Sequence, residues 1–261
     1  MKNNYNFKLI AGPCVVEDEK TVFETSKFLK KVCADNNIEL IFKSSYKKAN
    51  RTKYDSFTGI EPLRALEILK AVKDDLNIPV ITDIHETKDV EMVRNYVSHV
   101  QIPAFLCRQT DLLIAAGESG LTVNIKKGQF ASHATMEHAY DKVKQTGNDK
   151  ILITERGNTF GYSDLVVDIT NVPKLKLFCD DVFVDCTHSL QKPNQRAGVT
   201  GGDPKLISTM CYASIAAGAT GLFIETHPNP SEALSDSLSM LPLREIESII
   251  NKSVKIKQAI S

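Results

Sequence analysis

The feature that most constrains the fold is an alternation, along the whole chain, of short apolar runs with longer segments of helical periodicity. The apolar runs predict eight strands, at residues 8–16, 40–46, 79–85, 99–104, 121–127, 150–156, 181–189 and 221–227. Segments with a helical pattern separate them, for example residues 21–36, 62–76, 87–97, 135–146 and 204–217. Repeated strand–helix units of this kind indicate an α/β protein with a parallel sheet.

Length decides between the two common parallel-sheet architectures. The chain has 261 residues, of which 42% are hydrophobic, and a (β/α)8 barrel typically has about 250. Eight strand–helix units in this length favour a closed barrel over an open, doubly wound sheet. The sequence shows no repeat, low-complexity tract or flexible linker. We therefore expect one (β/α)8, or TIM-barrel, domain spanning residues 1–261.

The composition argues against some classes of binding partner. Lys and Arg together number 32 and so do Asp and Glu, whereas nucleic-acid binders usually carry a basic excess. The sequence has no apolar run of about 20 residues, the length of a membrane span, and no signal-peptide pattern. Its six cysteines are scattered, without a CxxC pair, which is typical of reduced, mostly buried thiols. We expect a cytoplasmic protein with no nucleic-acid or membrane partner.

Polar side chains gather where the predicted strands end. They are Lys43 and Ser45, Asp83 and His85, Gln101, Asn124 and Lys126, Thr154 and Arg156, Cys186 and His188, and Glu225 and His227. Residues two apart on a strand point to the same side. Any one of these alone is most simply a solvated boundary residue or a helix cap. Because so many strands end this way, and because barrel enzymes draw functional residues from several strand ends, we expect one shared pocket.

Two chemical sets can be separated within this group. Five cations suit the binding of phosphates and a carboxylate: Lys43, Lys48, Arg51, Lys126 and Arg156. A thiol, an imidazole and two carboxylates suit a divalent transition metal: Cys14, His188, Glu225 and Asp236. A single cysteine is more often a small buried hydrophobe. The first, seventh and eighth strands are neighbours in a closed ring, however, which favours a shared metal site.

Eight stretches of sequence together resemble one enzyme family. They are IAGPCVVED (10–18), FKSSYKKANRT (42–52), ITDIHE (81–86), QIPAFLCRQTDLL (101–113), VNIKKGQF (123–130), TERGNTFGYSDLVVD (154–168), DCTHSLQKP (185–193) and GLFIETHPNPSEALSDS (221–237). In order and spacing they are similar to the 3-deoxy-D-manno-octulosonate 8-phosphate synthases. That family condenses phosphoenolpyruvate with D-arabinose 5-phosphate and water, releases phosphate, and so supplies a sugar acid of lipopolysaccharide.

The resemblance implies roles for individual residues. Phosphoenolpyruvate would be held by Lys43, Gln101, Lys126 and Arg156. Arabinose 5-phosphate would be bound by Ser45, Asn50 and Arg51, with Asp83 on its hydroxyls and Arg108 reaching its phosphate across a subunit interface. The pocket would be lined by Pro103, Ala104 and Phe105, and Lys48 would lie close to both substrates. The family forms homotetramers, so the resemblance implies one here.

The resemblance also bears on the metal. One class of the family binds a divalent metal through a cysteine in the GPC segment, and the other has asparagine there and needs none. Cys14 implies the metal-dependent class, with His188, Glu225 and Asp236 completing the site. Zn, Fe, Mn and Co all suit such ligands. Lys48, His188 and Asp236 are the catalytic candidates, and whether the metal activates water or polarises the aldehyde stays open.

One segment departs from the family pattern, and three rival functions are compatible with the sequence. Residues 56–61 read SFTGIE where many relatives read SFRGPG, so Thr58 and Ile60 bear on sugar-phosphate binding. The sister synthases, which make 3-deoxy-D-arabino-heptulosonate 7-phosphate from erythrose 4-phosphate, typically read KPRTS where residues 48–52 read KANRT. The second rival is a Schiff-base aldolase using Lys43 or Lys126, and the third is a non-catalytic barrel. Residues 191–203 and 50–60 are predicted loops, the first a candidate lid.

Overall fold

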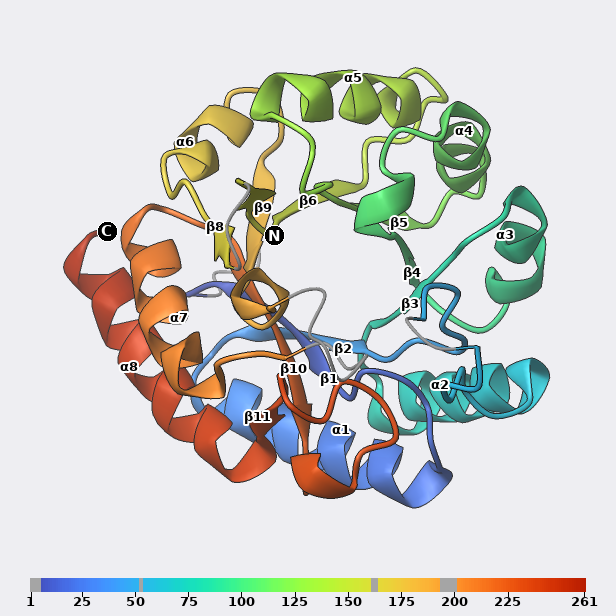
Figure 1. Ribbon diagram of the computed structural model, residues 1–261, viewed down its shortest axis with the longest axis horizontal. Coiled ribbons are helices and arrows are strands. Elements are labelled where there is room, and N and C mark those ends of the chain that lie inside the picture. The colour runs from blue at the N-terminus through green and yellow to red at the C-terminus, as the bar shows by residue number, and fades with distance from the viewer. Residues whose placement is uncertain (1–5, 52–53, 161–163, 193–200) are drawn as a thin grey trace.

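The chain forms a closed barrel (Figure 1). The computed structural model describes residues 6–51, 54–160, 164–192 and 201–261. Within these residues, the barrel strands are β1 (Lys8–Gly12), β2 (Glu39–Lys43), β3 (Val80–Asp83), β4 (His99–Ile102), β5 (Thr122–Lys126), β6 (Ile151–Glu155), β9 (Asp181–Asp185) and β10 (Gly221–His227). They pair in parallel in that order, and β10 pairs back to β1. The predicted (β/α)8 fold is confirmed.

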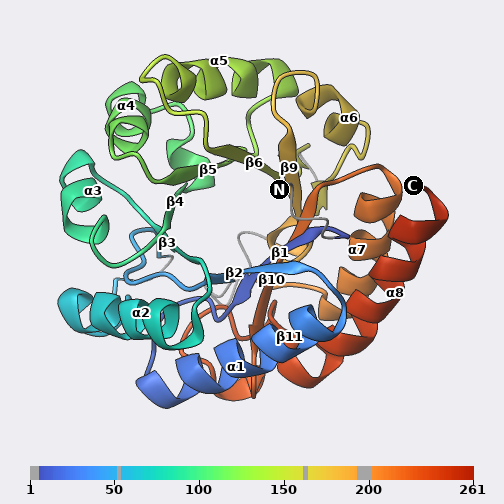
Figure 2. The ribbon, with the colours of Figure 1, turned by 180° about the vertical axis from the view of Figure 1, so that it is seen from behind.

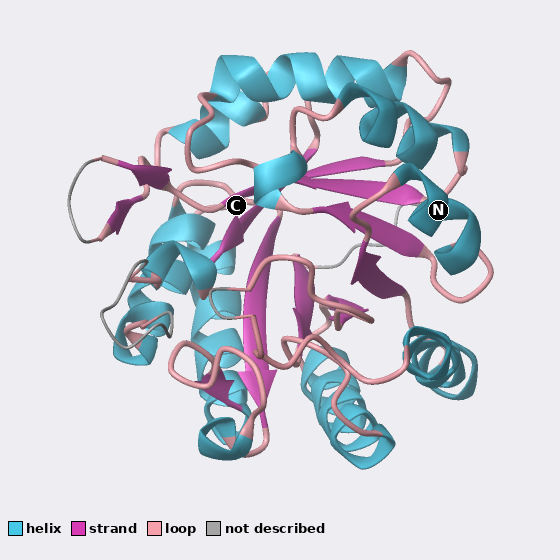
Figure 3. Cartoon of the chain, turned by 45° about the vertical axis from the view of Figure 1, so that its right-hand side comes forward, coloured by secondary structure: helices cyan, strands magenta, loops and turns pink. Residues whose placement is uncertain are grey.

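Helices surround the strands, as the views from the front, from behind and after a turn of 45° show (Figures 1, 2 and 3). They are α1 (Glu19–Asp35), α2 (Pro62–Leu76), α3 (Thr87–Val93), α4 (Thr110–Glu118), α5 (His133–Lys144), α6 (Asn171–Leu175), α7 (Ile207–Ala216) and α8 (Ile246–Ala259). Two short strands, β7 (Asn158–Thr159) and β8 (Leu165–Val166), pair beyond β6, and β11 (Leu241–Pro242) pairs in parallel with the end of β10. No helix within the described ranges is long and apolar enough to cross a membrane.

Local sequence signals set where the first helices begin. The Asp18 carboxylate accepts hydrogen bonds from the amide and the hydroxyl of Thr21, both at 2.7 Å, which caps the free amides of the first turn of α1. Glu61 caps α2 in the same way, with Pro62 at the first helical position, where its missing N–H costs nothing. The helix predicted over residues 62–76 is confirmed, whereas that over 204–217 divides into a 3-10 turn (Pro204–Leu206) and α7.

Most strands are shorter than the apolar runs that predicted them. At the end of β1, Gly12 has φ +157°, and a side-chain carbon placed there would lie 2.0 Å from the carbonyl oxygen of Lys43. Only glycine permits so close an approach of two backbones. Pro13 follows and cannot donate a ladder hydrogen bond. The chain therefore leaves the sheet two residues before Cys14 and turns across the mouth of the barrel.

The barrel interior is built in layers. One layer is apolar and fully enclosed, and consists of Ile10, Ile41, Ile81, Leu152, Phe183 and Phe223. Because side chains alternate, the residue two positions further along each strand faces the same interior, one layer nearer the carboxyl end. Those residues are Gly12, Lys43, Asp83, Thr154, Asp185 and Glu225. Strand periodicity thus places a polar layer, rich in charge, directly above an apolar floor.

Candidate active site

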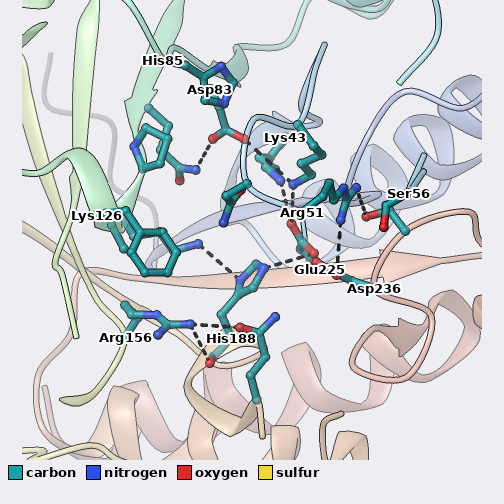
Figure 4. A pocket seen from close by; sticks show the side chains of 18 of the residues that line it. Lys43, Arg51, Ser56, Asp83, His85, Lys126, Arg156, His188, Glu225 and Asp236 are labelled. Atoms are coloured by element: carbon teal, nitrogen blue, oxygen red, sulfur yellow. Dashed lines mark hydrogen bonds and ion pairs between the residues drawn. The ribbon is translucent and has the colours of Figure 1, made fainter. Parts of the chain in front are cut away.

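A cavity of about 600 Å³ opens above this polar layer (Figure 4). Fourteen of the residues predicted from the sequence line it: Lys43, Lys48, Asn50, Arg51, Asp83, Gln101, Pro103, Ala104, Phe105, Lys126, Arg156, His188, Glu225 and Asp236. The structure therefore brings the two predicted chemical sets to one place. The residues of these sets are far apart in sequence, but the closed ring brings them together because β1 and β10 are neighbours.

Of the residues given a substrate, metal or catalytic role, three do not line the cavity. Ser45 lies behind it, where its hydroxyl donates to Asp83. The thiol of Cys14 lies beside Asp236, 3.2 Å from Oδ2. Arg108 is exposed and lines a second cavity with His138 and other residues of α5, so within one chain it is not brought to the pocket.

One flank of the cavity is cationic. Lys126 Nζ lies 2.5 Å from Asp185 Oδ2 and 3.8 Å from the centre of the Phe223 ring. Arg156 donates through Nη2 to the carbonyl oxygen of His188 and to Gln191 Oε1, both at 3.0 Å. Its other terminal nitrogen, Nη1, is buried and has no hydrogen-bond partner among the residues that the structure describes. Because a buried donor without a partner is costly, this nitrogen marks a place for an anion.

The residue that sequence reasoning missed is Asp185. Its carboxylate is fully buried, accepts the backbone amides of Thr187 and His188 at 3.0 and 2.7 Å, and lies 2.7 Å from His188 Nδ1. Burial alone raises the pKa of Asp185, but His188 and Lys126 overcome it and hold the pKa well below its usual range. Its position two residues after Phe183, in phase with the apolar layer, is the signal that identifies it.

A chain of hydrogen bonds runs around the barrel below the cavity. Asp83 accepts from Ser45 and from the Gln101 side-chain amide. Asn124 donates to Gln101 Oε1 at 3.2 Å and accepts from the Thr154 hydroxyl at 2.8 Å. All five side chains are buried. Each therefore has a partner that fixes its orientation, which makes this wall of the cavity rigid.

The opposite flank has the donor atoms of a metal site. One ligand atom each from Cys14, Glu225 and Asp236 can be chosen so that all lie within 4.8 Å of one another. His188 Nε2 lies 3.3 Å from Glu225 Oε2, but His188 is not part of that three-residue group. Thiolate, imidazole and carboxylate together are ligands that a divalent transition metal accepts.

Electrostatics make this flank receptive to a cation. Burial, followed by the nearby charges of Asp236 and Glu225, raises the pKa of the Cys14 thiol. Lys43 and Arg51 contact the two carboxylates beside this thiol, and a bound metal ion would remove the proton of the thiol, because a coordinating thiol is deprotonated. Asp236 has φ +50°, an uncommon conformation that asparagine and aspartate tolerate best. The donor set therefore fits the predicted metal.

Lysines connect the two flanks. Lys43 Nζ lies 2.6 Å from Glu225 Oε1 and 3.0 Å from the carbonyl oxygen of Cys14. Lys48 Nζ lies 4.0 Å from both Asp83 Oδ2 and Glu225 Oε1. Burial opposes its charge, but the nearby carboxylates, Glu225 and Asp83 among them, raise the pKa of Lys48. Lys48 is thus held as a cation near the middle of the cavity.

In two of the predicted strand-end pairs, only one residue lines the cavity. Cys186 packs into the core outside the barrel while His188 faces the cavity. The reason is that β9 ends at Asp185 and His188 begins a 3-10 turn (His188–Leu190), so the alternation of side chains stops between them. His227 lies near Glu17, with Nε2 3.8 Å from Oε2, and does not line the cavity.

The chain is similar to known proteins over nearly its whole length. The sequence model of the DAHP synthetase I family matches residues 2–261. Three similar proteins are named 2-dehydro-3-deoxyphosphooctonate aldolase. Those of Desulfotalea psychrophila and Koribacter versatilis are each 42% identical, covering 97% of this chain and 90% and 92% of their own length. That of Desulfatibacillum aliphaticivorans is 44% identical, covering 97% of this chain and 93% of its own.

These relatives confirm the resemblance that the eight sequence stretches indicated, since their names describe an enzyme of the octulosonate type. Both the matched family model and the relatives extend over nearly the whole chain. The chain therefore belongs to the DAHP synthetase I family.

Proposed function

We propose that this protein condenses phosphoenolpyruvate with D-arabinose 5-phosphate and water, giving 3-deoxy-D-manno-octulosonate 8-phosphate and inorganic phosphate for lipopolysaccharide synthesis. The observation that carries the proposal is the buried Nη1 of Arg156, which has no partner in the described part of the chain and lies on the same flank as Lys126, because a phosphorylated carboxylate satisfies both cations. The names of the relatives direct the choice among phosphorylated substrates.

The cavity supplies orientation more than covalent chemistry. Carbon 3 of phosphoenolpyruvate attacks the aldehyde carbon of the sugar, positive charge develops at carbon 2, water adds there, and phosphate leaves. Lys126 and Arg156 hold the first substrate by its anionic groups, and Asn50 and Arg51 hold the second from the opposite side. Fixing both partners converts a bimolecular step into an effectively unimolecular one. Lys48, the cation in the middle, faces both.

Cys14, His188, Glu225 and Asp236 would hold a divalent ion such as Zn, Fe, Mn or Co in this proposal. Such an ion acts as a Lewis acid on a carbonyl or increases the acidity of water. His188 is oriented for this set by Asp185, which occupies Nδ1 and leaves Nε2 toward Glu225. Asp236 is positioned for it through Arg51, whose Nη1 lies 3.7 Å from Oδ1.

Metal removal tests this part of the proposal. We expect dialysis against a strong chelator to abolish turnover and a divalent transition metal to restore it, because the flank then lacks its cation. For Cys14→Asn we expect weaker metal binding, measured by metal analysis of the purified protein, with part of the activity retained. Full activity in metal-free wild-type protein would contradict metal dependence.

We also propose that the active enzyme is a cytoplasmic homotetramer in which Arg108 serves a neighbouring pocket. Phe105 lines the cavity and yet is 57% exposed, and Phe130 nearby in the fold is 59% exposed. Exposed aromatic side chains at the mouth of a cavity are typical of an interface. Arg108 lies outside its own cavity, close along the chain to Phe105, so the same interface would carry it to a partner.

The decisive assay is phosphate release from phosphoenolpyruvate. We expect release with arabinose 5-phosphate, and little with erythrose 4-phosphate, the substrate of the sister synthases. Arg156→Lys removes the unpartnered nitrogen while keeping a positive charge, and we expect it to raise KM for phosphoenolpyruvate more than KM for the sugar. Release that favours erythrose 4-phosphate would replace the proposed substrate, and borohydride trapping of a substrate–lysine adduct would indicate a Schiff-base aldolase.

A further inference from the structure

Two neighbouring strands end in consecutive charges that face opposite sides of the barrel wall. Lys126 and Arg156 face the cavity. Lys127 and Glu155, next to them in sequence, face outward, and their side chains are completely buried. The inner two are both cations, whereas the outer two form an ion pair, with Lys127 Nζ 3.3 Å from Glu155 Oε1. The substrate proposal uses only the inner two.

Lys127 is bound to the loops that follow both strands. Its ammonium donates to the carbonyl oxygens of Gly128 and Ala131 in the loop after β5, at 3.3 and 3.1 Å. It also donates to the carbonyl oxygen of Gly157 and to Asn158 Oδ1 in the loop after β6, at 3.2 and 2.9 Å. One side chain therefore fastens the two loops to each other.

Glu155 fixes the backbone around Arg156. Its Oε1 accepts the amides of Arg156 and Gly157 at 2.9 and 2.6 Å, and its Oε2 accepts from the Asn171 side chain at 3.1 Å. Gly157 has φ +83°, so the chain turns sharply straight after Arg156. The carboxylate holds that turn in place, and with it the direction in which the guanidinium leaves the strand.

We propose that Lys127 and Glu155 are a positioning pair, which sets the spacing of Lys126 and Arg156 for a phosphorylated carboxylate. This inference rests on the proposed function. Two buried cations side by side repel each other before substrate arrives. Asp185 offsets part of that repulsion from within the cavity, and the outer pair locks the two strand ends together from behind.

Stability alone is a weak reason for this pair. Replacing a buried ion pair by well-packed apolar side chains is often neutral or stabilising. Burial lowers the pKa of Lys127 while Glu155 opposes that shift, so the charge of the amine depends on its partner. The pair is costly to bury, and the hydrogen bonds described above end on the loops after β5 and β6 and on α6. The geometry that the pair imposes on these loops explains it better than stability does.

Binding of phosphoenolpyruvate tests the proposal directly. We would measure Kd by calorimetry on full-length protein without sugar phosphate, with inorganic phosphate as a second probe. For Lys127→Met, of similar volume, we expect Kd for phosphoenolpyruvate to rise between about tenfold and 100-fold, the change that follows from losing one hydrogen bond to a charged group. KM for arabinose 5-phosphate should stay unchanged. Glu155→Gln keeps the acceptor oxygen for the two amides, and we expect a smaller rise.

A matched control is available at the other end of the barrel. Lys8 and Asp181 form an ion pair, at 2.7 Å, between the first residues of β1 and β9. Lys8→Met removes the same charge far from the cavity, and we expect Kd for phosphoenolpyruvate to stay at the wild-type value. If Lys127→Met lowers the thermal midpoint but binds phosphoenolpyruvate as tightly as Lys8→Met, the pair is structural and the proposal is overturned.

Two further outcomes are distinguishable. If Lys127→Met does not fold, Glu155→Gln decides, and wild-type binding in that variant overturns the proposal. If wild-type protein neither binds phosphoenolpyruvate nor releases phosphate from it, the proposed function itself fails, whatever the variants do. Weaker binding in both variants, with the sugar KM unchanged, supports the positioning role.

Discussion

At the scale of single residues, the cavity is organised by carboxylates that orient cations. Asp83 receives hydrogen bonds from Ser45 and Gln101 and lies 4.0 Å from Lys48. Glu225 contacts Lys43 and His188 at 2.6 and 3.3 Å. Burial of these carboxylates is tolerated only because they are paired. The cations proposed to bind substrate are thus already held in place by these carboxylates.

Asp185 offers the sharpest test at this scale. Asp185→Asn keeps the size of the side chain but loses the charge that orients His188 and neutralises Lys126. We expect kcat to fall between about tenfold and 100-fold, the usual effect of removing such a supporting carboxylate. KM for phosphoenolpyruvate should not rise, because removing a negative charge beside Lys126 favours an anion. Steady-state kinetics measures the effects on kcat and on KM separately. A raised KM with normal kcat would show that Asp185 mainly positions Lys126.

A partly buried histidine predicts a pH dependence of stability. Burial, and then Lys8 and Lys150, lower the pKa of His99 from 6.5 to about 4. The unfolded chain therefore binds a proton that the folded chain refuses, and stability is lost as the pH falls from 6.5 towards 4. Between pH 7.5 and 5 we expect a loss of about 2 kcal/mol from this group. Thermal midpoints of wild type and His99→Gln at both pH values measure it. Equal losses in the two proteins would contradict the assignment.

The sequence predicts individual site residues only where the regular structure continues. The cations Lys43, Lys126 and Arg156 follow strand periodicity and were found from it. Cys186 was paired with His188, but it continues the alternation of β9 and faces outward, whereas His188 lies in the 3-10 turn beyond the strand, where that alternation no longer holds. Ser235, whose hydroxyl lies 2.9 Å from Cys14 Sγ, sits in an irregular loop that no periodicity describes. Such contacts depend on tertiary structure.

At the scale of elements, the turn between β1 and α1 holds the flank of the cavity that contains Cys14, Glu225 and Asp236. Cys14 lies in this turn, and Asp18 ends it by capping α1. Next to the cap, Glu17 Oε1 accepts the amide of Leu234 at 2.8 Å, which ties the turn to the loop that carries Asp236. Donor atoms from opposite ends of the sequence are therefore held by one short segment. The candidate lid over residues 191–203 includes residues 193–200, which lie outside the described residues.

The cap of α1 can be tested separately from the chemistry. Asp18→Ala removes both hydrogen bonds to Thr21, and we expect a loss of about 1 kcal/mol of stability. In a protein of this size that lowers the thermal midpoint by roughly 2–4 °C. Asp18→Asn, which keeps a capping oxygen, should lose much less. We expect unchanged kcat in both. Equal shifts for the two variants would show that charge, and not capping, is what Asp18 supplies.

At the scale of the whole molecule, the barrel was predictable because its signals are redundant. Eight apolar runs at similar spacing leave few topologies besides a closed parallel sheet. Strand ends shifted by several residues, and the helical segment 204–217 divided, without changing the order of pairing. Closure could be inferred, and closure is what brings Cys14 to Glu225. The surface through which subunits would assemble could not be inferred in this way. It depends on exposed side chains such as Phe105, which belong to no strand or helix periodicity.

Assembly leads to the last prediction. If Arg108 serves a neighbouring pocket, Arg108→Ala should raise KM for arabinose 5-phosphate, and Lys126→Met should abolish turnover in its own pocket. Mixed oligomers, formed by co-expression with two different tags, then contain pockets with an intact Lys126 that receive Arg108 from a neighbour. We expect activity at low sugar phosphate to exceed that of either parent protein. Arg108 acting within its own chain gives no such recovery, because neither subunit has both residues.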